Sequence, residues 1–333
     1  MGKILIIGLG LIGGSVAKSL NCPVYALDTD PHTLKEAEQY LEAGYTDIEQ
    51  IDIQPEAVIL CAPVSAVLSM AEALGKRFPD SIFIDCCSTK RSVQKAFSGT
   101  KYAGMHPMAG SESSGFGSAR AGLFRGAAIC ITGQGEAADY ACALAEKLGG
   151  RIIRIDAGRH DAATAMISHM PHIVACALCA AAAEKGRVMP EVYSLAAGGF
   201  ADLTRIADSD PSMWGSILYD NSDEVLGSME ALQKQLDIWK DLLKNGSESS
   251  LREHFKACRE DKQNFKRDER GIYPKNGVSL YIDCAEEQLP HIAETAFGLG
   301  AAAVIKEGGR ARIICLQRRE AELIKSALGR EKT

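Results

Sequence analysis

The sequence lacks an excess of positive charge. Lys and Arg number 37 against 43 Asp and Glu, which gives a net charge of −6. A surface with this balance repels a polyanion, so we expect no nucleic acid among its partners. Long apolar runs are lacking as well, since the longest strongly apolar stretch, residues 173–183, falls well short of the roughly 20 residues that cross a bilayer. We therefore expect no transmembrane helix and no membrane partner.

The first residues also lack the marks of a secretion signal. Residues 1–10 have neither a cationic region of their own nor a small-residue cleavage site, and they fit a buried strand better. The 11 cysteines are odd in number and come without such a signal, which predicts free thiols rather than a disulfide framework. We expect a cytoplasmic protein in which most cysteines are small core residues.

What is present is the composition of an ordinary globular protein, 46% hydrophobic and 24% charged over 333 residues. That length suits two domains or slightly more. Up to residue 156, short apolar runs alternate with amphipathic stretches, as in a sheet covered on both faces by helical crossovers. The sequence predicts an α/β domain over residues 1–156, a doubly wound Rossmann-type sheet with strands at 4–7, 24–27, 57–60, 82–84, 128–131 and 152–155.

Residues 157–270 carry no further run of β signals and are expected to form an all-helical second domain. The stretch 161–183 holds nine alanines, which cost least in a helix and let helices approach closely. We expect its long first helix to be largely buried and to form a dimer seam. Later helices are predicted at 211–220, where Asp210 caps and Pro211 takes the first position, and at 222–243 and 250–265.

The end of the chain predicts a small third unit. Residues 266–277 are charged and punctuated by Gly and Pro, which marks a linker. Residues 278–333 then read as an α+β module in the order strand, helix, strand, strand, helix, with a hairpin at Gly308 and Gly309.

A glycine-rich turn after the first strand points to a nucleotide. Gly8 permits the tight turn, Gly10 lets the backbone reach a pyrophosphate, and Gly13 allows close packing of helix on strand. Asp28, at the end of the second strand, is placed to accept from a ribose hydroxyl and would repel a 2′-phosphate. The sequence thus predicts NAD rather than NADP, and assigns to the same site the neighbouring residues Leu11, Ile12 and Pro63.

Five separated segments then converge on one family. They are residues 8–15 (GLGLIGGS), 85–90 (DCCSTK), 106–112 (HPMAGSE), 168–172 (SHMPH) and the segment from 198 to 214. Together, and in this order, they resemble prephenate dehydrogenase. The resemblance implies NAD-dependent oxidative decarboxylation of prephenate to 4-hydroxyphenylpyruvate in tyrosine biosynthesis, or of arogenate to tyrosine. It also implies a homodimer.

The chemistry needs a base, and the resemblance assigns that role to His106 with Ser88 beside it. An imidazole titrates near neutrality, and we place His106 in a strand-end loop on the nicotinamide side of the sheet. Without the family, a His before Pro is as readily a structural loop residue, and Ser88 could cap a helix that begins near Thr89. Lys90 either adds positive charge nearby or is simply solvated.

Prephenate carries two carboxylates and needs a cationic clamp. Arg205 is our candidate, because a guanidinium grips a carboxylate in a bidentate manner. The alternative is an arginine paired with Asp202 or Asp208. By resemblance His169, His172, Glu112 and Trp214 also line the substrate pocket, although two packed core histidines would explain the first pair. No HExxH or closed Cys/His pattern is present, so no metal is expected.

The sequence departs from the family where many relatives carry Arg or Lys, because Ala201 stands there. This leaves open whether prephenate or arogenate is used. The third unit resembles an ACT-type regulatory domain without its final strand, and a structural or dimer-completing module is the alternative. Two other functions remain, another NAD dehydrogenase such as a β-hydroxyacid dehydrogenase, and a non-catalytic NAD-sensing regulator.

Overall fold

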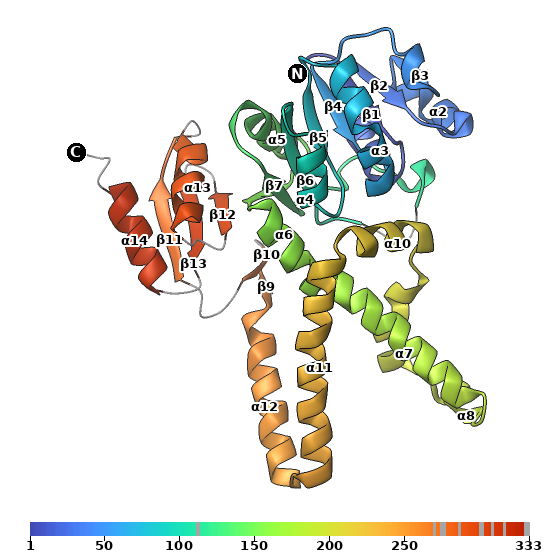
Figure 1. The fold of residues 1–333 in the computed structure, drawn as a ribbon, viewed down its shortest axis with the longest axis vertical. Helices are drawn as coiled ribbons and strands as arrows, with labels where there is room; N and C mark the ends of the chain where they lie inside the picture. Colours follow the sequence, from blue (N-terminus) through green and yellow to red (C-terminus); the bar gives the residue numbers. More distant parts are fainter. Residues whose placement is uncertain are drawn as a thin grey trace.

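The computed structural model describes residues 1–110, 114–268, 271–273, 278–285, 288–299, 303–307, 310–315 and 318–329. Its N-terminal part is a layered α/β domain (Figure 1). The strands are β1 (Ile4–Ile7), β2 (Val24–Leu27), β3 (Ala43–Tyr45), β4 (Ala57–Leu60), β5 (Ile82–Asp85), β6 (Lys101–Pro107), β7 (Ala128–Thr132) and β8 (Arg151–Arg154). The helices between them are α1 (Leu11–Ser19), α2 (Pro31–Ala37), α3 (Val64–Arg77), α4 (Arg91–Ala96) and α5 (Gly135–Lys147), with short 3₁₀ turns η1 (Glu38–Tyr40), η2 (Ile48–Gln50) and η3 (Phe116–Ser118).

The strand order confirms the predicted Rossmann-type sheet. From one edge it runs β3-β2-β1-β4-β5-β6, all parallel, and then β7, which is antiparallel to β6, and β8, which is parallel to β7. Strands β1, β4 and β5 are buried along their whole length, as continuous apolar runs require. Side chains of α1 and α5 complete the core on one face, and those of α3 and α4 on the other.

Two strands of this first domain were not predicted. β3 is short, and β6 has a mixed sequence that carries Gly104, His106 and Pro107. Our placement of His106 in a loop is therefore wrong, because it lies inside β6 and pairs in register with Cys130 of β7.

The second domain is helical, as predicted, and Figure 1 shows a long helical hairpin projecting from it. The chain runs through α6 (Ala157–Thr164), a π-helical turn η4 (Ala165–His169) and α7 (Met170–Gly186) without leaving the helix. It continues with α8 (Glu191–Leu195), α9 (Gly198–Thr204), the 3₁₀ turn η5 (Arg205–Asp208), α10 (Pro211–Asp220), α11 (Ser222–Asn245) and α12 (Glu248–Asn264). Asp210 caps α10 through Met213 N, and Pro211 holds its first turn, as expected.

The long first helix is not largely buried, which corrects the prediction. Within α7 only Met170, Ala175 and Gly186 are buried by this chain, while Val174 and Leu178 are exposed. By length and hydropathy alone, the span Ala157–Gly186 could cross a membrane, yet its first turns are packed into the protein. An apolar surface of this kind fits a helix that a second subunit covers.

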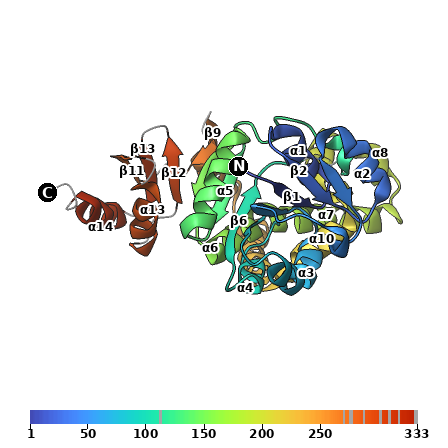
Figure 2. The same cartoon turned by 90° about the horizontal axis from the view of Figure 1, so that it is seen from above.

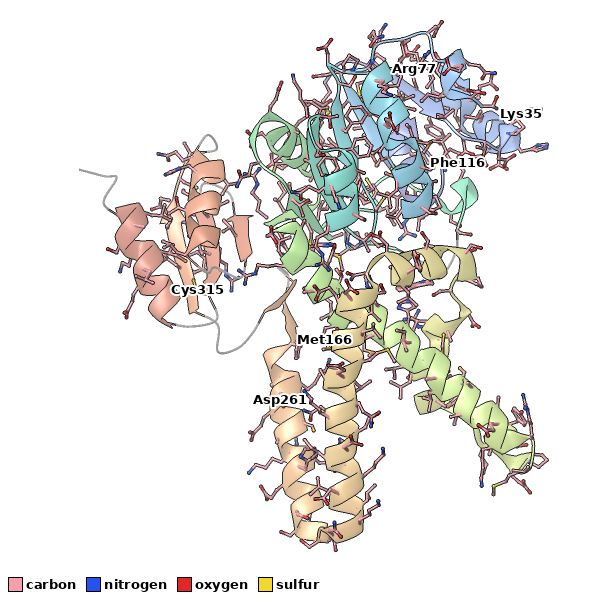
Figure 3. The ribbon with its side chains drawn as sticks, in the orientation of Figure 1. Lys35, Arg77, Phe116, Met166, Asp261 and Cys315 are labelled. Carbon is pink, nitrogen blue, oxygen red and sulfur yellow. The ribbon has the colours of Figure 1, made fainter. Side chains whose placement is uncertain are left out.

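The third unit has the predicted element order. It comprises β11 (Val278–Asp283), α13 (Leu289–Gly298), β12 (Ala303–Glu307), β13 (Arg310–Cys315) and α14 (Arg318–Gly329), around a core that includes Cys315, labelled in Figure 3. Our linker at 266–277 holds two short antiparallel strands, β9 (Lys266–Asp268) and β10 (Gly271–Tyr273), instead of irregular chain alone. The predicted hairpin glycines lie outside the described residues.

The third unit also extends the first domain. Strand β12 pairs with the edge of β8, at Val304 with Arg154 and at Ile305 with Ile153. The result is one sheet of 11 strands, seen from above in Figure 2 with the third unit at one end.

Candidate functional site

The glycine loop between β1 and α1 has the shape that a dinucleotide requires. Gly8 has φ +90°, and a Cβ there would come within 2.9 Å of Ala62 N, so only glycine fits. A Cβ on Gly13 would overlap the carbonyl oxygen of Gly8. A Cβ on Gly10 would meet no described atom within 4 Å, so the backbone is open to a ligand at the start of α1. The loop therefore fits a pyrophosphate at a helix N-terminus, with Leu11 and Ile12 in the first helical turn.

Asp28 follows β2 and braces the same loop. Its Oδ2 accepts from Leu9 N at 2.8 Å and its Oδ1 accepts from Asp30 N at 3.0 Å. Each carboxylate oxygen has a second lone pair, so these bonds still leave room for a ribose hydroxyl. Pro63 is exposed at the start of α3, just beyond the carboxyl end of β4. These residues fit the predicted NAD.

At the end of β6, His106 takes part in a hydrogen-bonded row of three side chains. His106 Nδ1 lies 2.8 Å from His160 Nε2, and His160 Nδ1 lies 2.8 Å from Asp161 Oδ1. His160 and Asp161 are on α6 and are only 1% and 2% exposed. The row thus joins the sheet of the first domain to the first helix of the second.

The row dictates where the protons lie. Asp161 carboxylate accepts from His160 Nδ1, so neutral His160 has its lone pair on Nε2 and accepts from His106 Nδ1. The lone pair of neutral His106 is then on Nε2. Burial, with the nearby charges of His160, Lys90 and His169, lowers the pKa of His106 well below 6.5. His106 is thereby held neutral at about pH 7 and able to accept a proton.

Asp161 is itself held in its charged form. Burial alone would raise its pKa, but hydrogen bonds from His160 and from two backbone amides outweigh that effect and lower it. Those amides are Lys90 N, 2.8 Å from Oδ1, and Arg91 N, 2.9 Å from Oδ2. The carboxylate therefore caps the start of α4 from another segment, which replaces our alternative that Ser88 caps this helix.

Under the site lies a buried ion pair. Lys90 is fully buried, not solvated, and its ammonium pairs with Asp85 Oδ1 and donates to Cys87 O at 2.6 Å. Tyr102 OH also donates to Asp85. Burial disfavours the charged ammonium, yet the Asp85 carboxylate outweighs it and raises the pKa of Lys90. These bonds fix the turn after β5 that presents half-buried Ser88.

His169 and His172 sit with Trp214 in one aromatic cluster. The His172 ring stacks on Trp214 with centroids 3.4 Å apart, and His169 meets Trp214 edge-on at 6.0 Å. His172 Nδ1 donates to Ser168 O at 2.9 Å. His169, at the end of the π turn that contains Met166 (labelled in Figure 3), is 1% exposed, and burial lowers its pKa to about 4.

Two further predicted residues occupy less defined positions. Arg205 is exposed at the start of η5, a turn that packs against α7. Glu112 lies outside the described residues. Ala201 is exposed on α9, one turn before Arg205.

Polar contacts tie the two domains together beside the row. Arg91 pairs with Glu224 of α11 at 3.0 Å, and Ser92 Oγ donates to Asp220 Oδ2 of α10 at 2.6 Å. Asn221, between α10 and α11, donates from Nδ2 to Asp161 O at 2.9 Å. Both domains therefore set the position of Asp161.

Sequence reasoning missed His160, Asp161 and Asn221. The signal available was an adjacent His and Asp at the head of an apolar helix, because such polar side chains are buried only with partners. In the part of the chain that the structure describes, no group of three or more His, Cys, Asp or Glu side chains has the arrangement of a metal site.

Comparison with known proteins matches two family models. Residues 14–154 match the nucleotide-binding domain of prephenate dehydrogenase, and residues 156–257 match its dimerization domain. The chain is 37% identical over 250 residues to a prephenate dehydrogenase of Lactococcus lactis, covering 71% of this chain and 70% of that protein. A Bacillus subtilis prephenate dehydrogenase is 31% identical, with 84% and 80% covered.

A solved structure agrees. Prephenate dehydrogenase from A. aeolicus, crystallised with hydroxyphenyl propionate and NAD+, superimposes with a TM-score of 0.73 at 29% identity, over 80% of this chain and 99% of that one. The two family models together cover most of the chain, and the chain belongs to the prephenate dehydrogenase family.

Proposed function

We propose that this chain catalyses the NAD-dependent oxidative decarboxylation of prephenate to 4-hydroxyphenylpyruvate. The observation that carries the proposal is the row His106, His160 and Asp161, which ends at the sheet edge where the glycine loop fits a dinucleotide. Membership of the family supplies the substrate, and the row supplies a base for its hydroxyl proton. When bound, NAD supplies the hydride acceptor.

His106 removes the hydroxyl proton as the ring loses hydride and CO2. The proton goes to Nε2, where the row leaves the lone pair, and the imidazolium that forms donates from Nδ1 to His160. The negative charge of Asp161, held by the amides at the start of α4, stabilises that cation through His160. In this proposal Ser88, on the turn held by Lys90, bonds the substrate hydroxyl.

The substrate is an anion, so its pocket needs a cation for the carboxylates and side chains that line the ring. In our proposal Arg205 grips one carboxylate, and His172 with its stacked Trp214 forms part of the wall. His169 and Glu112 belong to the same pocket. Ala201 provides no second cation one turn before Arg205. The Arg205 guanidinium therefore makes most of the electrostatic contribution to binding the substrate carboxylates.

The test is NADH formation, followed by absorbance, with prephenate and with arogenate in separate reactions. We expect turnover with prephenate, and a loss of about 10²- to 10⁴-fold in kcat for His106→Asn. Exposed His32, on α2, gives the matched control His32→Asn, which should keep full activity. Turnover of arogenate alone would replace the substrate, and no turnover of either would refute the proposal.

We further propose a cytoplasmic homodimer whose third unit is ACT-like. Support for the dimer comes from the exposed apolar side chains of α7 and α11, among them Val174, Leu178 and Leu226. Support for the ACT-like unit is its element order and its sheet order β11-β13-β12. Light scattering measures the mass, and tyrosine added to the full chain tests regulation. A monomer, or activity that tyrosine leaves unchanged, would remove the respective assignment.

A further inference from the structure

Asn221 stands at the joint between α10 and α11, where an asparagine commonly caps a helix. Its side chain makes no cap bond to α11. It is 2% exposed and reaches instead into the site, where Nδ2 lies 2.9 Å from Asp161 O and 3.2 Å from His169 Nδ1. The amide therefore links both parts of the site, the row on α6 and the aromatic cluster around Trp214.

The orientation of this amide follows from chemistry. Asp161 O is a backbone carbonyl and can only accept, so the group that faces it is the NH2 of Asn221. That nitrogen carries two hydrogens, and the second one is available to His169 Nδ1. A ring nitrogen that accepts has a lone pair and no proton, so the proton of His169 is on Nε2.

We propose that Asn221 is a positioning residue that holds His169 uncharged, with its proton on Nε2. An imidazolium would turn Nδ1–H toward the NH2 group of Asn221, donor against donor. This inference rests on the proposed function for its catalytic meaning, because a neutral His169 places no second positive charge beside His106 when that residue takes the substrate proton.

The surroundings of His169 favour the same form. The titratable groups near it are His160 and Asp161 of α6, His172 of α7 and His106 of β6, with the Trp214 ring from α10. Burial, with the charges of His160 and His172, lowers the pKa of His169 to about 4 against the opposing pull of Asp161. His172 has the opposite tautomer, with its proton on Nδ1, because Ser168 O accepts from Nδ1 and the lone pair is left on Nε2.

The experiment is ¹⁵N NMR of the full-length protein labelled at histidine, with His169 assigned from the His169→Gln spectrum. Wild-type protein at about pH 7 should show neutral His169 with the proton on Nε2. In Asn221→Asp a carboxylate replaces the donor, so the proton should move to Nδ1 and the pKa of His169 should rise by more than about one unit. Asn245→Asp adds the same charge at the exposed far end of α11 and should change neither.

The outcomes separate this inference from the proposed function. A wild-type His169 with its proton on Nδ1 overturns the inference even if prephenate is turned over, and so does an Asn221→Asp spectrum that matches wild type. The wild-type spectrum tests the tautomer even if Asn221→Asp does not fold, because it needs only the assignment from His169→Gln. A protein that turns over neither substrate but shows the Nε2 proton would overturn the function and keep the assignment of Asn221.

Discussion

The buried ion pair of Lys90 and Asp85 allows a sharp prediction about stability. Both side chains are 0% exposed, and the ammonium is surrounded by Asp85 and Cys87 oxygens. Lys90→Met leaves the Asp85 carboxylate charged and unpaired in the core, which costs about 3–5 kcal/mol in the free energy of unfolding. The pair Lys76 and Glu72 is exposed to solvent, at 75% and 82% exposure, and is screened by it, so Lys76→Met is the matched control and should change the stability little.

Urea unfolding followed by far-ultraviolet circular dichroism measures both variants. The double variant Lys90→Met, Asp85→Asn should be more stable than Lys90→Met alone, because the second change removes the stranded charge while Tyr102 keeps an acceptor. If Lys90→Met costs less than about 1 kcal/mol, or if the second change destabilises further, then the pair does not act as described.

Three further outcomes follow from the site. Gly13→Ala should weaken NAD binding at least about tenfold in a fluorescence titration, because its Cβ overlaps a loop carbonyl, whereas Gly227→Ala in α11, with no described atom within 4 Å, should bind normally. The folded pKa of His169, about 4, lies below its ordinary 6.5, so the unfolded chain binds the proton first and stability falls as pH drops from about 6.5 to about 4. Urea midpoints at several pH values should show a shallower fall in His169→Gln and no change in exposed His32→Gln. His160→Gln should lower kcat by about tenfold or more, and a change confined to KM would contradict the row.

Much of the first domain could be predicted from the sequence, because its strands are apolar on both faces and its glycine loop is local. Strand β6 could not. Its sequence mixes apolar and polar residues with glycine because its residues contact segments that are distant in the sequence. A Cβ on Gly104, for example, would lie about 2.5 Å from Lys90 Cδ, so the glycine makes room for the buried lysine. Lys90 itself looks like a surface residue until Asp85 is placed beside it.

The sequence identified some residues of the candidate site but not the residues that connect them. His106, His172 and Trp214 were found through family motifs, and the structure groups the last two. The residues between them, His160 and Asn221, have roles that depend on contacts between segments far apart in the sequence, which no spacing in the sequence reveals. The exposure of α7 has a similar cause, because apolar residues around a helix predict burial without saying which chain provides it.

The π turn at Ala165–His169 has a geometric consequence for this arrangement. His160 and His169 are nine positions apart, and at about 100° per residue a regular α-helix would put them on opposite sides. A π turn takes in about one extra residue, so the separation counts as roughly eight positions and the two rings differ by only about 80°. Deleting one residue between Ala165 and Ser168 would remove the extra residue and still leave the two rings about 80° apart, whereas winding all the present residues as a regular α-helix would turn His169 away from Asn221. The wide turn is thus what lets a single helix serve both parts of the site.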